Sequence, residues 1–291
     1  MDKKLVGPVM ILYIAWGLNW VVMTVANRYF PAIVFVALRF SLGALVLILY
    51  CLIRRVPLPE KCFWPWIALS GILMMALNNL LVQIATRHLG AGLVAVLNYS
   101  MSVWTAILGM VFLHEKMTAR KAGGIILALV GLFVLMRVNV SGELWAVFMM
   151  IGASMIWAVS NLITKAKLAG CSRIAMTTGQ MICGAAVLDV AALVTNHDPV
   201  QWTLPGLGAL VYNGVLCSAV AFVIWSRMLD KMEAGTASVT VMAVPAIGVL
   251  AGVIFLHEPM TVSRAIGMIL LFVGILTVVG AGLPAKKRSR K

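Results

Sequence analysis

The chain has 291 residues, of which 63% are hydrophobic and only 11% are charged, and its formal net charge is +14. Water-soluble domains carry about 25% charged residues, so a chain this apolar cannot hide its surface in one soluble core. The basic residues form short clusters between long apolar runs, a placement that argues against a nucleic-acid partner and for an all-α integral membrane protein with membrane lipid as its solvent.

Ten segments are long and apolar enough to span a membrane, which takes about 20 residues in a helix. The first carries Trp16, Asn19 and Trp20 and has nearly the length that a bilayer requires, so we interpret it as an uncleaved span and not as a signal peptide. Short loops connect most of the segments. The predicted spans are roughly 5–25, 32–53, 65–86, 90–113, 119–136, 144–165, 174–195, 206–228, 235–256 and 262–281.

The distribution of Lys and Arg predicts the orientation, because cytoplasmic loops carry an excess of both. With a cytoplasmic N-terminus, 18 of these residues fall on the cytoplasmic side and 4 in outside loops. The basic tail at residues 283–291 then lies at the anionic cytoplasmic leaflet, which attracts it. We therefore expect a multi-pass protein of a bacterial cytoplasmic membrane with both termini in the cytoplasm.

The two halves of the chain repeat each other. Residues 109–118 (GMVFLHEKMT) match residues 252–261 (GVIFLHEPMT) at an offset of 143. The repeat predicts one five-helix domain at 1–140 and a second at 141–282. Because five is an odd number of spans, the second domain would insert upside down, as in the inverted repeats of many secondary transporters. The match continues at Gly124 with Gly267 and at Gly131 with Gly274.

Polar side chains inside the predicted spans mark the faces that avoid lipid, because an unpaired polar group in hydrocarbon is costly. Alternatively, such groups only join neighbouring helices by hydrogen bonds. Stripes at matching depth in several helices favour a central cavity, formed by the first four helices of each half, with the fifth helices facing lipid. The candidate cavity residues are Trp16, Asn19, Trp20, Arg39, Asn78, Asn79, Asn98, Tyr99, Ser102, Trp157, Asn161 and Gln180.

Arg39 stands inside the second predicted span, and its counterpart in the second half is the uncharged Gln180. Three roles for Arg39 are open. Its guanidinium can bind a substrate carboxylate or phosphate through two N–H groups, pair with Asp189, or donate to carbonyls at a helix end. Asp189 is the acidic residue predicted inside a span, where it either carries a coupling proton or occupies a solvated or paired position.

The fourth and ninth spans both end in a His-Glu pair, at 114–115 and 257–258. The spacing does not fit the H-E-x-x-H pattern of metal sites, so we expect structural roles. Thr118 and Thr261 are placed to cap the helices that follow, with the two glutamates at the water interface. Pro245 predicts a hinge in the ninth span. The fourth span has no proline there, so we expect the two halves to bend differently.

These residues resemble the drug/metabolite transporter superfamily, and in particular its EamA-type members. The resemblance lies in Trp16-Gly17-Leu18-Asn19, in Leu38-Arg39-Phe40, in the Leu-x-Glu that closes spans four and nine, and in the duplicated ten-span layout. It covers essentially the whole chain. It implies a basket-like bundle around a central cavity and export of amino acids, related small metabolites or drugs, driven by the proton gradient. The usual Gly-Glu is His-Glu here, and the proline of the fourth span is missing.

The leading hypothesis is a secondary transporter with a small-molecule substrate and coupled protons, working as a monomer or weak dimer. A channel or uncoupled facilitator is the first alternative, and a membrane-embedded enzyme is the second. No P-loop pattern occurs, and no histidine falls at membrane depth with a nucleophile or metal ligands beside it. The five cysteines are scattered, so no metal and no cofactor is predicted.

Overall fold

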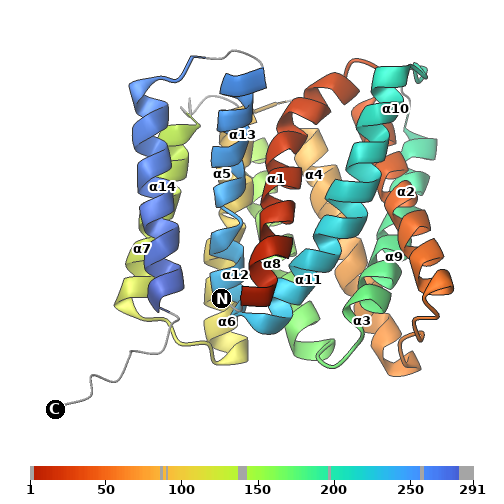
Figure 1. The fold of residues 1–291 in the computed structure, drawn as a ribbon, viewed down its shortest axis with the longest axis horizontal. Coiled ribbons are helices and arrows are strands. Elements are labelled where there is room, and N and C mark those ends of the chain that lie inside the picture. The colour runs from red at the N-terminus through yellow and green to blue at the C-terminus, as the bar shows by residue number, and fades with distance from the viewer. Residues whose placement is uncertain are drawn as a thin grey trace.

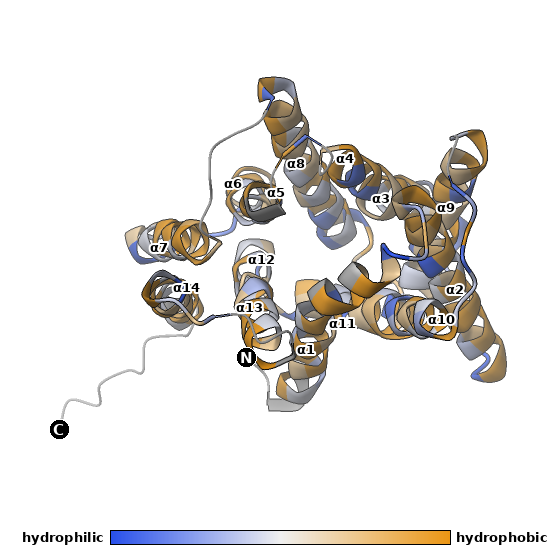
Figure 2. Ribbon diagram, turned by 90° about the horizontal axis from the view of Figure 1, so that it is seen from above, coloured by the Kyte–Doolittle hydropathy of each residue, from blue (hydrophilic) through white to orange (hydrophobic). Residues whose placement is uncertain are grey.

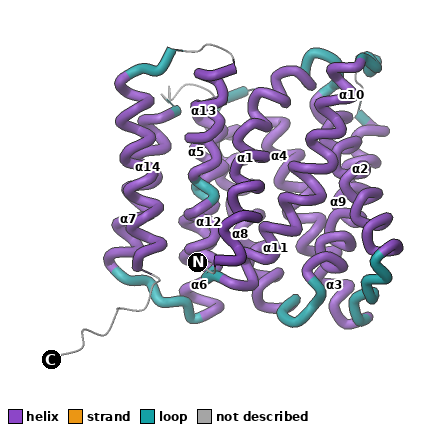
Figure 3. The backbone as a smooth tube through the Cα atoms, in the orientation of Figure 1, coloured by secondary structure: helices purple, strands orange, loops and turns teal. Residues whose placement is uncertain are grey.

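The structure of the protein, a computed structural model, describes residues 3–85, 88–89, 91–136, 143–195, 198–255 and 259–281. Within these ranges the side chains at positions 3–5, 20, 24, 91, 92, 255 and 281 are not described. Every secondary-structure element in these ranges is helical, which confirms the predicted all-α class. The helices run alongside one another across the molecule, and short loops join them (Figures 1 and 3). The predicted basic tail at 283–291 lies outside the described residues.

Each predicted span corresponds to one helix or to consecutive helical segments. In the described part of the chain, nine of the ten predicted spans form helices long and apolar enough to cross a membrane. The remaining one, α7, has 17 residues. In chain order the elements are α1 (Lys3–Ala26), α2 (Ala32–Ile53), η1 (Lys61–Phe63), α3 (Trp64–Gly71), η2 (Ile72–Leu77), α4 (Asn78–Ala85), α5 (Ala91–Tyr99), α6 (Met101–Leu113), α7 (Ala119–Leu135), α8 (Leu144–Lys167), α9 (Arg173–Val194), α10 (Leu204–Val211), η3 (Tyr212–Val220), α11 (Ala221–Lys231), α12 (Ala234–Thr240), α13 (Ala243–Phe255) and α14 (Val262–Ala281).

Four spans are interrupted. The third and eighth each contain a π-helical segment, η2 and η3, of a kind often found at functional sites. The ninth breaks at Val241–Met242, visible as a loop between α12 and α13 in Figure 3. This break lies just before Pro245, whose ring excludes the carbonyl four residues upstream. The fourth span breaks at Ser100 without a proline. Both halves are thus interrupted in this span, at nearly corresponding positions of the repeat, and whether they bend differently stays a prediction.

α7 and α14 pack against each other along one side of the bundle, apart from the ring formed by the other helices (Figure 2). Glycine makes this contact close, as in many membrane helix pairs. A Cβ at Gly131 would lie 2.3 Å from the nitrogen of Leu271, and one at Gly267 would lie 2.4 Å from the nitrogen of Leu135. Residues late in α7 thus face residues early in α14, and the two helices are antiparallel. The same crowding occurs at Gly124 and Gly274.

The predicted helix caps are present. The Thr118 hydroxyl accepts a hydrogen bond from the Lys121 backbone N–H at 3.1 Å, and Thr261 accepts one from the Arg264 N–H at 3.3 Å. Glu115 differs from expectation, because its side chain is only 6% exposed and does not sit at an open water interface. The matching pair at 257–258 lies outside the described residues.

Candidate substrate cavity

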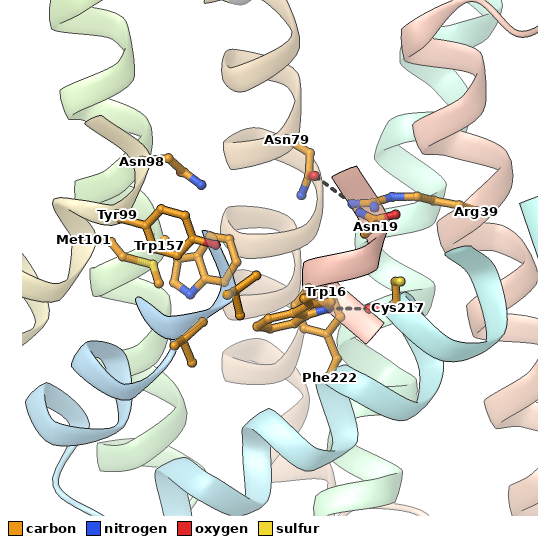
Figure 4. A pocket seen from close by; sticks show the side chains of 12 residues that line it. Trp16, Asn19, Arg39, Asn79, Asn98, Tyr99, Met101, Trp157, Cys217 and Phe222 are labelled. Atoms are coloured by element: carbon orange, nitrogen blue, oxygen red, sulfur yellow. Dashed lines mark hydrogen bonds between the residues drawn. The ribbon is translucent and has the colours of Figure 1, made fainter. Parts of the chain in front are cut away.

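A cavity of about 140 Å³ lies between the helices of the two halves (Figure 4). Its wall combines amide, guanidinium and aromatic side chains, and none of its lining residues belongs to α7 or α14. Two of the interrupted spans reach it next to their breaks, through Tyr99 and Met101 and through Val241 and Val244. The lining residues are Trp16, Asn19, Arg39, Asn79, Asn98, Tyr99, Met101, Trp157, Cys217, Phe222, Val241 and Val244.

Arg39 on α2 is held by two amide oxygens. Its Nη2 donates to Asn79 Oδ1 at 3.0 Å, drawn as a dashed line in Figure 4, and its Nη1 donates to Asn213 Oδ1 at 3.3 Å. Both amides are oriented by backbone carbonyls. Asn79 Nδ2 donates to the carbonyls of Met74 and Met75, at 3.2 and 3.1 Å, which belong to the π-helical segment η2. The π-helical segment therefore helps to aim Asn79, and through it the guanidinium.

The Arg39 guanidinium has no anionic partner among the described residues. It stacks over the ring of Phe40, with 4.6 Å between its Cζ atom and the ring centroid. Its Nε atom is buried and has no hydrogen-bond partner in the described chain. A cation inside a membrane span costs free energy when only neutral groups surround it. Two of its five N–H groups donate to the amides, so the guanidinium keeps N–H groups, Nε–H among them, for a further acceptor.

Asp189 is not the partner of Arg39. Its carboxylate on α9 accepts from the Ser41 hydroxyl of α2, at 2.9 and 2.8 Å to its two oxygens. Ser41 lies two residues from Arg39, on a different face of α2. The predicted alternatives in which Arg39 pairs with Asp189 or donates to helix-end carbonyls are therefore wrong, and Asp189 does not line the cavity.

Aromatic rings close the cavity on the other side. The Trp16 ring meets Phe222 edge-on, with 5.5 Å between centroids, and Trp157 lies stacked on Phe222 at 6.5 Å. Trp16 Nε1 donates to the Cys217 carbonyl at 2.9 Å. In Figure 4 the rings of Trp16 and Phe222 lie apart from the amides of Asn79 and Asn98, so the wall has a polar part and an aromatic part.

Three more polar atoms of the wall have no hydrogen-bond partner within the described chain. They are Asn19 Oδ1, Asn98 Oδ1 and Trp157 Nε1, and each is buried. Buried polar groups in folded proteins are almost always hydrogen-bonded, so unpaired groups that line one cavity indicate a ligand or water site. The wall thus offers two acceptors, the Asn19 and Asn98 amide oxygens, and two donors, the Trp157 N–H and the Arg39 Nε–H. This set suits a small ligand that has both an anionic group and N–H or O–H donors.

Seven of the predicted cavity residues line this space, and four do not. The four are buried where neighbouring helices meet, because their spans present more than one protected face. Trp20 lies in α1, but its side chain is outside the described part. Asn78 donates to the Ala153 carbonyl, Ser102 to the Ser238 carbonyl, Asn161 accepts from Trp225 Nε1, and Gln180 donates to Ser70 and Thr164.

The sequence did not identify Asn213, which holds Arg39, or five of the lining residues, Met101, Cys217, Phe222, Val241 and Val244. Asn213 carries a usable signal, since it is the one asparagine in the eighth span, at a depth where an unpaired amide is costly. Phe222 and Cys217 carry none, because apolar residues occupy lipid-facing and cavity-facing positions alike in a membrane helix.

A bundle of membrane-spanning helices that encloses a polar cavity between interrupted helices is typical of membrane transporters. The model of the EamA-like transporter family matches residues 6–137 and 144–280, and the chain belongs to that family. The protein is thus a multi-pass membrane protein of a family named for transport.

Curated relatives span nearly the whole chain. The uncharacterized transporter YvbV of Bacillus subtilis is 28% identical and covers 92% of this chain and 88% of its own. The probable amino-acid metabolite efflux pump of Escherichia coli K12 is 24% identical, with 94% of each chain covered. The uncharacterized inner membrane transporter YedA of the same organism is 24% identical over 97% of this chain and 93% of its own.

A solved crystal structure shares the fold. It superposes with a TM-score of 0.83 at 16% sequence identity and covers 97% of this chain and 98% of its own. At this identity the match establishes the fold alone.

Proposed function

We propose that the protein is a secondary transporter that exports a small metabolite across the bacterial cytoplasmic membrane by alternating access, coupled to the proton gradient. An amino acid or a related compound is the substrate class that we favour over a drug. The cavity of about 140 Å³ is smaller than the roughly 300–1,000 Å³ of drug-sized pockets. The name of the Escherichia coli relative, an amino-acid metabolite efflux pump, points the same way.

The observation that carries the proposal is the guanidinium of Arg39, which reaches the cavity without a counter-ion from the described part of the chain. A substrate carboxylate at Arg39 would supply the missing negative charge through charge-assisted hydrogen bonds. The free acceptors Asn19 Oδ1 and Asn98 Oδ1 would take the donors of an ammonium group. The rings of Trp16 and Phe222 would pack against the apolar part of the molecule.

Alternating access requires two similar halves that exchange conformations, and two observations support the inverted repeat at 1–140 and 141–282. The family model matches one segment in each half. The equivalent fifth helices, α7 and α14, are antiparallel and pack through glycines that correspond in the repeat. Equivalent helices that point in opposite directions are expected when the second half is inserted upside down.

The orientation and the coupling are the finer parts of the proposal. The excess of Lys and Arg supports cytoplasmic ends for both termini. Asp189 is our candidate for the coupling proton, since a carboxylate inside a span is rare and commonly part of a proton path. Its hydrogen bonds to Ser41 join α9 of the second half to α2 of the first, so its protonation state can affect how the halves meet.

A thermal-shift screen of the purified protein against amino acids, organic acids and purines tests the substrate class. Zwitterionic and anionic compounds should raise the melting temperature most, and Arg39→Ala should abolish the rise. Counterflow of the best compound, radiolabelled, into preloaded proteoliposomes then separates a carrier from a channel or facilitator. Transient accumulation above equilibrium supports a carrier. Simple equilibration without accumulation favours the channel, and the absence of any shift rejects the assigned cavity.

A further inference from the structure

A cluster of four charged side chains lies at the opposite end of the bundle from the first residues of α8, and the cavity does not include it. Glu115 and Lys121 come from the first half, and Lys165 and Glu233 come from the second. The Glu115 and Lys121 side chains are only 6% and 4% exposed. Glu115 follows α6, Glu233 precedes α12, Lys121 stands early in α7 and Lys165 late in α8. These helix ends lie at the end of the bundle where α1 begins (Figure 1). In the predicted orientation this is the cytoplasmic end.

The contacts of the cluster join the two halves. Glu115 lies 3.4 Å from Lys165 Nζ and 3.8 Å from Lys121 Nζ, and Lys121 Nζ lies 2.8 Å from Glu233. Glu115 also accepts hydrogen bonds from the backbone N–H groups of Ala234, at 2.6 Å, and Gly235. These two residues begin α12.

The two halves pack closely beside the cluster, although the Lys165 and Glu233 side chains are 24% and 42% exposed. Gly235 lies against Ala106 of α6, where an added Cβ would be 3.0 Å from the Ala106 Cα atom. Every residue of α12 is buried. Trp225, hydrogen-bonded to Asn161 at 3.2 Å, fills the region between the cavity and this end, since it follows Phe222 by one turn of α11. Trp225 and the buried helix α12 therefore lie at the end of the cavity that faces the cluster.

We propose that Glu115, Lys121, Lys165 and Glu233 form a latch that holds the transporter closed at the cytoplasmic end. The inference rests on the proposed transport function. The four charges sum to zero, so the closed cluster is neutral. When the halves separate here, water replaces the lost contacts, because the cluster lies at a membrane surface and not in hydrocarbon. Such ion pairs can therefore break and re-form, as an alternating-access cycle requires.

Native Cys217 provides the test, since it lines the cavity. A variant that keeps Cys217 and carries serine at the other four cysteines is labelled with a membrane-impermeant maleimide. The labelling is done in sealed membrane vesicles that expose one membrane face at a time. A second variant that keeps only the exposed Cys62 identifies the face that carries the Glu115 end. Glu115→Gln should raise the labelling rate of Cys217 from that face about tenfold and leave the rate from the other face unchanged or lower.

Glu143→Gln is the matched control, because Glu143 is an exposed glutamate at the opposite end of the bundle, and it should not change either rate. Glu233→Gln weakens the contact to Lys121 and leaves those of Glu115 in place, so it should give a smaller rise. Unchanged labelling in a Glu115→Gln protein that elutes as a single folded species overturns the latch, as does an equal rise from both faces. The assay needs no substrate, so failed counterflow with the expected labelling would reject the transport proposal separately.

Discussion

Arg39 and Asn79 are joined by a hydrogen bond of 3.0 Å between Nη2 and Oδ1, although 40 positions separate them in the chain. Asn79 holds the cation without neutralising it, because the amide oxygen is a dipole and not a charge. Asn79→Asp places a carboxylate of the same shape at this point. We expect affinity for the ligand found by thermal shift to fall by about tenfold or more, since a fixed anion then competes for the guanidinium.

Calorimetric titration of the purified variant measures this effect. Gly152→Ala is a suitable control, since a Cβ at Gly152 meets nothing within 4 Å. Unaltered affinity in Asn79→Asp would show that Arg39 does not contact the ligand.

Arg39→Ala and Asn98→Ala should each impair transport more than Gly152→Ala does. Hydrogen bonds that involve a charged group contribute about 1.5–3 kcal/mol, so Arg39→Ala should reduce transport efficiency about 10- to 100-fold. Asn98→Ala should have a smaller effect, because it removes a neutral acceptor. Initial rates in proteoliposomes at matched protein amounts provide the measurement, and equal rates in all three variants would reject the cavity.

Gly131→Ala should destabilise the protein, because its Cβ would lie 2.3 Å from the backbone nitrogen of Leu271. Overpacking of this kind costs about 1–3 kcal/mol, which should appear as a lower melting temperature in detergent. Gly123→Ala on the same helix is the control, since nothing lies within 4 Å of the added atom. An unchanged melting temperature for Gly131→Ala would contradict the close α7–α14 contact.

Asp189→Asn should separate coupling from transport. The amide can still accept from the Ser41 hydroxyl, so the contact between α2 and α9 persists, but the side chain no longer takes up a proton. We expect counterflow to continue while accumulation driven by an imposed pH gradient is lost. Both are measured in the same proteoliposomes. Accumulation that survives in the variant would remove Asp189 as the coupling group.

Much of the fold follows from local patterns. The ten apolar runs coincide with helices or consecutive helical segments, because a helix is the structure that pairs all of its backbone groups within one segment in lipid. The interruption at Val241–Met242 also has a local cause, because Pro245 lacks a backbone N–H and its ring excludes the carbonyl of Val241. The break at Ser100 has no such local cause, so the sequence alone did not reveal it.

The cavity was predicted in part. Trp16, Asn19, Arg39, Asn79 and Asn98 were identified because polar or amphipathic groups at membrane depth must find a protected face. Gln180 and Asn161 carry the same signal, yet they lie in helix–helix contacts. Polarity indicates that a side chain is protected from lipid, but not whether a neighbouring helix or a cavity protects it.

The sequence by itself determined that this is a multi-span membrane protein with a duplicated pattern and a buried cation, since span length, residue type and repetition are local properties. Only the tertiary structure decided which groups surround Arg39, that Asp189 turns to Ser41, and that Glu115 is buried between the halves. Those facts depend on how helices far apart in the chain rotate and approach one another, and helix periodicity leaves that rotation undetermined when several faces of a span are protected.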